Sequence, residues 1–179
     1  MRRFAILILI FSVLCSVMTS CSDYADNPRY EDIAYREDGF EIVLTNDMQR
    51  YDSEEYDFYF TNILGTVIIT ASKLDGEFLE EEGCEPDISP EAYVDFLIKK
   101  SALDKDGLYY EYDEKRDLHS FRYTYAPADE GESFYYVCVL GSVGNIWYVE
   151  MICSGDDSEF YLPSFEKWKK KLDTYIPEE

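Results

Sequence analysis

The chain has 179 residues, of which 38 are acidic and 16 are basic, and its formal net charge is −22 at pH 7. Because nucleic-acid binding depends on Lys and Arg side chains that neutralise phosphates, this acidic composition excludes DNA and RNA as partners. Aromatic residues make up 17% of the chain and can bury large apolar areas, which excludes intrinsic disorder and, at this length, indicates one folded domain.

The first 20 residues have the pattern of an export signal. A charged start at residues 1–3 precedes an apolar run from Phe4 to Met18, which is shorter than the roughly 20 residues that cross a bilayer as a helix. The segment Met18-Thr19-Ser20-Cys21 resembles the lipobox of bacterial lipoproteins, with Met18 where leucine is usual. We therefore expect a signal peptide at residues 1–20 and lipidation of Cys21. An ordinary cleaved signal and a retained helix are the alternatives.

Lipidation of Cys21 would decide where the protein works. Durable attachment without a spanning helix takes two acyl chains, because a single chain binds a membrane only reversibly. Diacylglycerol on Cys21 supplies both, so the sequence predicts a protein anchored on the extracytoplasmic face of the cell membrane, with the lipid bilayer as a partner. Residues 21–38 are polar, acidic and without periodicity, and we interpret them as a flexible tether before a globular domain at residues 39–179.

The first part of this domain has strand patterns. Phe40, Ile42 and Leu44 alternate with polar residues, which is the period of a half-buried strand, and a second strand is predicted at residues 56–61. After a turn at residues 62–65, the β-branched run at residues 66–72 predicts a strand covered on both faces.

A helix is predicted to begin at Ser89-Pro90-Glu91, with Ser89 as its cap and Pro90 at the first helical position. We expect Asp106-Gly107 to end it. Its predicted inner stripe consists of Tyr93, Phe96, Leu97 and Ser101.

The second half predicts four more strands, at residues 108–113, 118–125, 133–140 and 146–153, the last two joined by a glycine-containing hairpin loop. A final helix is predicted at residues 163–176. One face would carry Phe165, Trp168, Leu172, Tyr175 and Ile176. The other carries lysines at 167 and 169–171, which we interpret as offsetting the negative end of the helix, with docking to an anionic surface as the alternative.

The order of these elements resembles that of the PsbP-like superfamily. The resemblance covers about residues 40–176 and includes the segments Ser89-Pro90-Glu91-Ala92-Tyr93, Gly144-Asn145-Ile146-Trp147-Tyr148 and Phe165-Glu166-Lys167-Trp168. It implies an α+β fold, with an antiparallel β-sheet of about six to seven strands flanked by helices on both faces. It also implies a non-enzymatic role in binding or assembling other proteins. The metal-binding histidines of photosynthetic members have no counterpart, so the resemblance assigns no functional residue.

The sequence predicts no catalytic residue, metal site or cofactor. His119 is the single histidine, and alternation places it with Phe121 and Tyr123 on one sheet face, where a packed residue is more common than a catalytic base. No Gly-x-Ser-x-Gly motif marks a nucleophile. A hairpin centred on Val143 would separate Cys138 from Cys153 by more than a disulfide spans, so we expect two buried, unbridged thiols. With Cys84 they lack Cys-x-x-Cys spacing, which argues against a metal site.

Our leading functional hypothesis is a non-enzymatic, membrane-anchored module that binds or scaffolds another envelope protein. Candidate contact residues are Tyr109, Tyr110 and Tyr112, because tyrosine supplies contact area at a low cost in entropy, with cross-strand packing as the alternative. A second hypothesis is that the acidic loops bind a cation or a small ligand. An enzyme would require a cleft in which His119 or a pair of carboxylates converges with buried neighbours.

Overall fold

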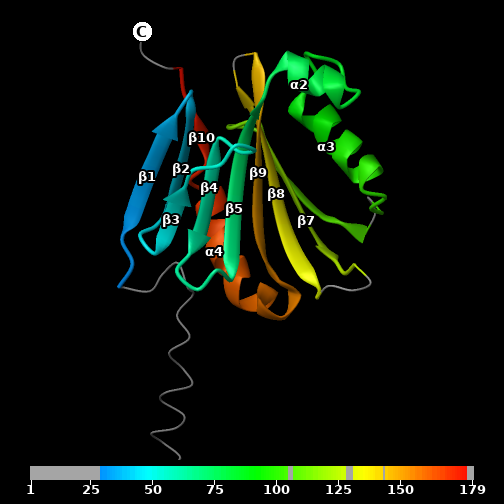
Figure 1. The fold of residues 1–179 in the computed structure, drawn as a ribbon. Helices are drawn as coiled ribbons and strands as arrows, with labels where there is room; N and C mark the ends of the chain where they lie inside the picture. The colour runs from blue at the N-terminus through cyan, green and yellow to red at the C-terminus, as the bar shows by residue number, and fades with distance from the viewer. Residues whose placement is uncertain (1–28, 105–106, 128–130, 143, 177–179) are drawn as a thin grey trace, which may run out of the picture.

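The computed structural model describes residues 29–104, 107–127, 131–142 and 144–176 (Figure 1). Its largest element is an antiparallel sheet of seven strands in the order β3-β4-β5-β9-β8-β7-β6. The strands are β3 Met48–Tyr51, β4 Phe58–Asn62, β5 Val67–Leu74, β6 Tyr109–Asp113, β7 Leu118–Tyr125, β8 Ser133–Ser142 and β9 Asn145–Ser154.

A second sheet has three strands in the order β1-β2-β10. These strands are β1 Asp32–Glu37, β2 Phe40–Thr45 and β10 Asp173–Thr174. The alternating Phe40, Ile42 and Leu44 of β2 are fully buried, as their period predicts. Phe40 stacks on Trp147 of β9 with ring centroids 4.5 Å apart, so the small sheet packs against the large one.

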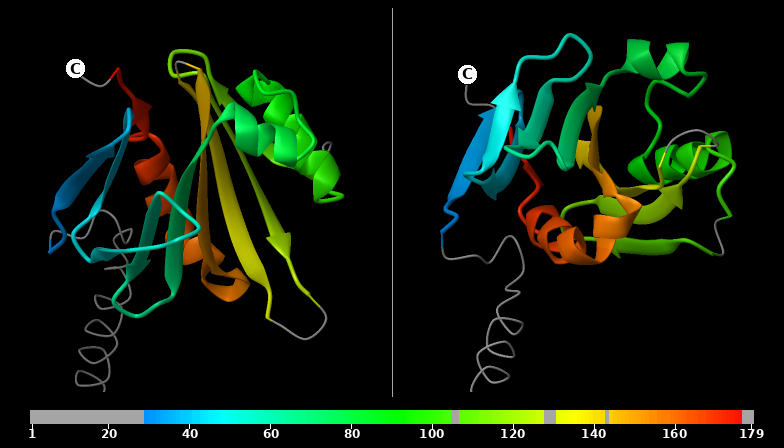
Figure 2. Two further views of the ribbon diagram at one scale, coloured as in Figure 1. Left: turned by 45° about the horizontal axis from the view of Figure 1, so that its top comes forward. Right: turned by 60° about the horizontal axis from the view of Figure 1, so that its bottom comes forward.

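Helices cover both faces of the large sheet, as Figure 2 shows. They are α2 Gly76–Glu81, α3 Pro90–Lys100 and α4 Ser158–Lys169, the last preceded by a short 3-10 turn, η3 Gly155–Asp157. On β8, Tyr136 and Cys138 pack into the core beneath α4, whereas Val137 and Val139 pack into the core beneath α3. The α+β fold with an antiparallel sheet between helices is therefore confirmed.

The first strand corrects the predicted tether. Residues 32–37 pair with β2 along their whole length, from Asp32 opposite Thr45 to Glu37 opposite Phe40. Apart from the half-buried Tyr35, the residues of β1 are exposed, so no apolar alternation marks this strand in the sequence. Backbone pairing and the edge contact between Tyr35 and Phe60, at 4.7 Å, hold it in place.

The final helix also differs from its prediction. It begins at Ser158, so Pro163 lies inside it, and it ends at Lys169. Phe165, Trp168 and Leu172 are buried as expected, but the chain then turns into β10 and leaves Tyr175 and Ile176 exposed. A proline at the sixth helical position removes only one backbone hydrogen bond, and the 3-10 turn before Ser158 supplies the true start.

The predicted start of α3 is confirmed, because the Ser89 side chain accepts a hydrogen bond from the backbone N–H of Ala92 at 3.2 Å. The helix ends earlier than expected, since Ala102 adopts a φ of 53°. Ser101 is consequently exposed, and Val94 and Ile98 join Tyr93 in the core.

The predicted signal peptide at residues 1–20 and the predicted lipidation site Cys21 lie outside the described residues. Within the part of the chain that the structure describes, no helix has the length and apolar character needed to cross a membrane.

Candidate functional site

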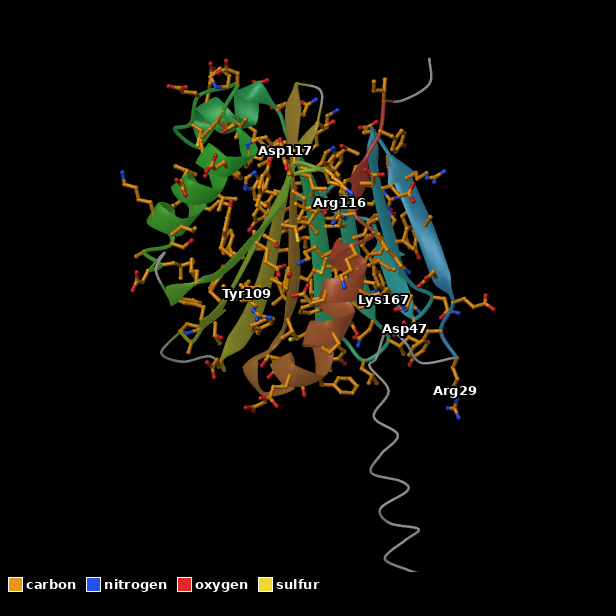
Figure 3. The ribbon with its side chains drawn as sticks, turned by 180° about the vertical axis from the view of Figure 1, so that it is seen from behind. Arg29, Asp47, Tyr109, Arg116, Asp117 and Lys167 are labelled. Carbon is orange, nitrogen blue, oxygen red and sulfur yellow. The ribbon has the colours of Figure 1, made fainter. Side chains whose placement is uncertain are left out.

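A cleft of about 550 Å3 lies at one end of the large sheet. Four segments line it: the loop from α2 to α3, the turn between β6 and β7, the β8–β9 hairpin, and the chain after β10. Figure 3 shows Asp117, which lines the cleft, at the opposite end of the molecule from Arg29, where the described chain begins. The cleft therefore faces away from the point at which the chain enters the domain.

Gly141 allows these segments to meet. Its N–H donates to the carbonyl of Asp117 and its carbonyl accepts from the Thr174 hydroxyl, both at 3.2 Å. A Cβ at this position would collide with the Asp117 carboxylate and lie 3.3 Å from Cγ of Pro90. The absence of a side chain at Gly141 thus lets the β6–β7 turn, the start of α3 and the C-terminal segment approach one hairpin.

Asp117 joins the cleft to a histidine behind it. Its Oδ1 lies 3.4 Å from Nε2 of His119, whose side chain is only 5% exposed. The other ring nitrogen, Nδ1, lies 2.5 Å from the Tyr110 hydroxyl, and the Tyr112 ring stacks on the imidazole at 4.3 Å. A neutral imidazole that carries its proton on Nε2 can donate a hydrogen bond to Asp117 and, at Nδ1, accept one from the Tyr110 hydroxyl. His119 is therefore packed against two tyrosines and one carboxylate.

The three candidate tyrosines lie on β6, an edge strand, and are exposed by 44% for Tyr109, 39% for Tyr110 and 51% for Tyr112. They do not form one surface. Tyr110 and Tyr112 point to the α3 side, opposite Phe121 and His119, while Tyr109 lies on the α4 side opposite Arg122. Each also makes cross-strand contacts, such as the Arg122 guanidinium 3.7 Å from the Tyr109 ring centre. Of the three tyrosines, only Tyr110 and Tyr112 contact His119, which pairs with Asp117 of the cleft, and they lie beside the cleft without lining it.

The electrostatics beside the cleft favour positive charge. The pKa of the Tyr112 hydroxyl is raised by desolvation and then by the negative charges of Asp117 and Glu114. An aromatic ring that adjoins carboxylates is the environment that attracts ammonium and guanidinium groups. This end of the molecule can therefore accept a cationic group, with Asp117 as its nearest counter-ion.

The lysines near the end of α4 lie differently from the prediction. Lys169 is buried on the α4 side, where it pairs with Glu111 and, at 2.9 Å, with Glu166. Burial opposes its charge, but hydrogen bonds to Glu111, Tyr136 and Glu166 raise the pKa of Lys169 above its ordinary value. Lys171 pairs with Asp32 of β1.

An arginine bonds the last carbonyl of α4 and a carbonyl just beyond the helix. Arg116 donates to the carbonyls of Lys169 and Leu172 at 3.0 and 3.2 Å. The Arg116 guanidinium, which pairs with Asp113 at 2.7 Å, therefore offsets the negative end of the helix dipole. The lysines were expected to have this role.

Burial disfavours the thiolate form of the three cysteines in the described part of the chain. Cys84, Cys138 and Cys153 are unbridged, and the last two are buried, as expected. The hairpin pairs Cys138 with Val149 and Cys153 with Phe134, one residue away from the predicted register. Desolvation raises the pKa of the Cys153 thiol to about 12 and also raises the pKa of Cys138.

Across residues 29–104, 107–127, 131–142 and 144–176, no group of three or more His, Cys, Asp or Glu side chains is arranged to hold a metal ion.

Sequence reasoning missed two cleft residues, Asp117 and Gly141, and the segment after β10. Asp117 could have been identified by its position, because it lies two residues before the single histidine and next to the start of a strand. The role of Gly141 depends on what approaches it from other elements, which no local pattern shows.

The sequence matches no protein-family model and no curated protein. Its fold is similar to solved structures. The cyanobacterial PsbP protein CyanoP from Synechocystis sp. PCC 6803 has a TM-score of 0.55 at 13% identity, covering 82% of this chain and 92% of CyanoP. LpqN, involved in cell envelope biogenesis of Mycobacterium tuberculosis, has a TM-score of 0.52 at 10% identity, covering 86% and 96%. A Bacteroides thetaiotaomicron structure has a TM-score of 0.52 at 11% identity, covering 82% and 49%. The chain thus has a PsbP-like fold.

Proposed function

We propose that this protein is a lipid-anchored, extracytoplasmic binding module that holds a partner protein of the cell envelope in the cleft beside Asp117, without catalysing a reaction. The lipobox-like segment that ends at Cys21 supports the anchor. The fold shared with an envelope-biogenesis protein and with a PsbP protein supports an envelope role.

The observation that carries the proposal is the position of the cleft. It lies at the end of the sheet opposite Arg29, and the anchor would attach eight residues before Arg29. A domain tethered at one end presents its other end to the surrounding compartment. The cleft and the adjoining Tyr110 and Tyr112 would then be accessible to a second protein.

The chemistry of the cleft indicates what kind of segment it binds. Its apolar wall includes Leu79, Ile88 and Ile146, and Asp87 and Asp117 contribute carboxylates. The whole chain carries a net charge of −22, so long-range attraction favours a basic partner and disfavours a second copy of the same chain. We infer that the partner inserts a Lys or Arg side chain, flanked by apolar residues, next to Asp117.

The anchor is tested by growing cells with an alkyne-labelled fatty acid and determining the mass of the mature N-terminal peptide. We expect acylated Cys21 as the first residue and a membrane-bound protein. The Cys21→Ser variant should carry no label and should leave the membrane fraction. An unmodified Cys21 in the mature wild-type protein would refute this part of the proposal.

The binding surface is tested by photocrosslinking in cells from a benzophenone amino acid at position 112. Position 51 is the matched control, because Tyr51 is also an exposed tyrosine on an edge strand, β3, at the other side of the same sheet. We expect one reproducible protein adduct from position 112, lost in the Asp117→Ala background, and none from position 51. Equal labelling from both positions would contradict a specific surface at the cleft.

A small cationic ligand is the second candidate, because a volume of about 550 Å3 lies within the usual range for small-molecule sites. Binding to the native state alone would raise the melting temperature with ligand concentration. Amine-containing compounds that stabilise the wild-type protein, but not Asp117→Ala, would favour this function over a protein partner.

A further inference from the structure

We propose that the tip of the β4–β5 hairpin, formed by Ile63 and Leu64, inserts into the surface of a zwitterionic phospholipid bilayer and seats the domain on the membrane. The inference rests on the proposed acylation of Cys21 and adds a second, non-covalent contact. It identifies the end of the domain that faces the lipid.

The two side chains are unusually exposed for their type. Ile63 is 72% exposed and Leu64 is 80% exposed, and they are adjacent at the centre of a four-residue turn. Central turn positions usually carry Gly, Pro, Asn, Asp or Ser, each for a reason of backbone geometry. Local turn chemistry therefore does not explain two aliphatic residues here, whereas contact with an apolar phase does.

The turn holds these side chains in a fixed position. The Asn62 carboxamide oxygen accepts from the N–H groups of Thr66 and Val67 at 2.9 and 3.3 Å, and its Nδ2 donates to the Thr66 hydroxyl at 2.9 Å. Gly65 closes the turn with a φ of +69° and donates to the Asn62 carbonyl at 2.9 Å. The Thr66 hydroxyl also lies 2.8 Å from the hydroxyl of Tyr161 on α4. A preorganised tip loses little conformational entropy when it enters the lipid.

The anchor would attach at the same end of the molecule. In Figure 1 the β4–β5 turn lies at the end where β1 starts, and Figure 3 places Arg29 there. The eight residues from Ser22 to Arg29 reach at most about 29 Å when fully extended. An acylated Cys21 would therefore keep Arg29 within that distance of the headgroups, while the ten residues of β8 carry the cleft about 33 Å further along the sheet.

The charges at this end select the kind of lipid. Asp156, Asp157 and Glu159 lie at the start of α4, which Figure 1 shows at the same end as the turn. Carboxylates near a membrane are repelled by anionic headgroups, and this repulsion falls off within a Debye length. The tip is therefore suited to a zwitterionic surface such as phosphatidylcholine or phosphatidylethanolamine.

The test uses the mature protein, isolated from cell membranes, in phosphatidylcholine vesicles whose acyl chains carry bromine, a short-range quencher of tryptophan fluorescence. The Leu64→Trp variant reports on the tip, because Trp147 and Trp168 are buried and give a constant background. The Glu114→Trp variant, in the exposed β6–β7 turn next to the cleft, is the matched control. We expect the added emission of Leu64→Trp to fall roughly twofold, as for an interfacial tryptophan, and that of Glu114→Trp to stay unchanged.

Flotation of the vesicles, a series with anionic lipid and salt, and crosslinking from the tip separate the ways in which the proposal could fail. If both variants float with the vesicles but Leu64→Trp is not quenched, the insertion is refuted while the anchor stands. If neither variant floats, the acylation fails and the insertion fails with it. Adding phosphatidylglycerol at low salt should weaken the quenching, and salt should restore it. Stronger quenching on anionic lipid, or a tip that crosslinks to protein instead of phospholipid, would overturn the inference.

Discussion

Gly141 and Asp117 lie so close together that no side chain fits between them. The N–H of Gly141 donates to the Asp117 carbonyl at 3.2 Å, and the Asp117 carboxylate occupies the space that a Cβ would need. The floor of the cleft therefore depends on one residue of the β8–β9 hairpin and one residue of the β6–β7 turn. This relationship ties the position of the proposed cation-binding carboxylate to the backbone of the central sheet.

The Gly141→Ala substitution should displace the Asp117 side chain. We expect a loss of about 1–3 kcal/mol in the free energy of unfolding, as for other insertions into a tightly packed region, together with weaker crosslinking from position 112. Urea denaturation measures the first effect. Gly131→Ala is the control, because a Cβ at Gly131 would have no atom of the described residues within 4 Å beyond its own chain neighbours. Equal stabilities for the two variants would show that the carboxylate moves aside without cost.

Lys169 is expected to contribute to stability through its two carboxylate partners. Lys169→Met removes the positive charge between Glu111 and Glu166 and leaves both carboxylates without this partner. We expect the free energy of unfolding to fall by about 1–3 kcal/mol. The loss is limited because both carboxylates remain partly solvated. The exposed Lys170 supplies the control, and Lys170→Met should stay within about 0.5 kcal/mol of the wild type. A shift of the urea midpoint in both variants would assign the effect to net charge instead of to the buried pair.

Glu150 should make the protein less stable as the pH rises. Desolvation raises the pKa of this carboxyl, which accepts a hydrogen bond from the Tyr148 hydroxyl at 2.5 Å. The folded state thus keeps the proton to a higher pH than the unfolded chain. The free energy of unfolding is therefore highest below the ordinary glutamate pKa and falls as the pH passes through the raised value.

Glu150→Gln should remove this dependence. The variant should exceed the wild type in melting temperature at pH 7, and the difference should shrink towards pH 4. Glu159→Gln, at an exposed position of α4, should leave the profile unchanged. A wild-type protein that gains stability between pH 4 and pH 7 relative to Glu150→Gln would contradict the predicted sign.

Thiol titration should report both the fold and the processing of the chain. The sequence contains five cysteines, of which Cys138 and Cys153 are buried and Cys84 is partly exposed. In the native mature protein we expect a maleimide to react first with Cys84. After denaturation, three thiols should react if Cys21 is acylated, and four if residues 1–20 are removed without acylation. Mass spectrometry of the labelled protein gives the count directly.

Much of the large sheet could be predicted from the sequence because its strands carry their own signals. β7 has the predicted bounds, and β8 and β9 each extend the prediction by one or two residues into the hairpin. Ser89 and Pro90 marked the start of α3 because capping is a local interaction. The elements that could be predicted are therefore those that apolar periodicity or a helix cap marks in the local sequence.

Two strands of the small sheet carry no apolar periodicity of their own and depend on pairing with β2. β1 is exposed and exists as a strand because β2 pairs with it, while β10 has only Asp173 and Thr174 and pairs with Glu41 and Phe40. The cleft could not be predicted from local patterns, because Asp117 and Thr174 are brought together by their separate hydrogen bonds to Gly141 in the folded chain. Period-two alternation does predict that Tyr109 lies on the other face from Tyr110 and Tyr112, so the three candidate contact residues divide between the two faces of the sheet.

The pairing of β10 with β2 has a consequence for how the molecule is made. The N–H of Tyr175 donates to the carbonyl of Gly39 at 2.8 Å, so a segment near residue 175 completes a sheet that begins more than 130 residues earlier in the chain. Such a non-local contact can form only after the chain up to residue 175 is available, and closing the long loop between the two segments costs entropy. A polypeptide threaded through a translocation pore with its N-terminus first would thus lack the third strand of the small sheet until residue 175 had passed through.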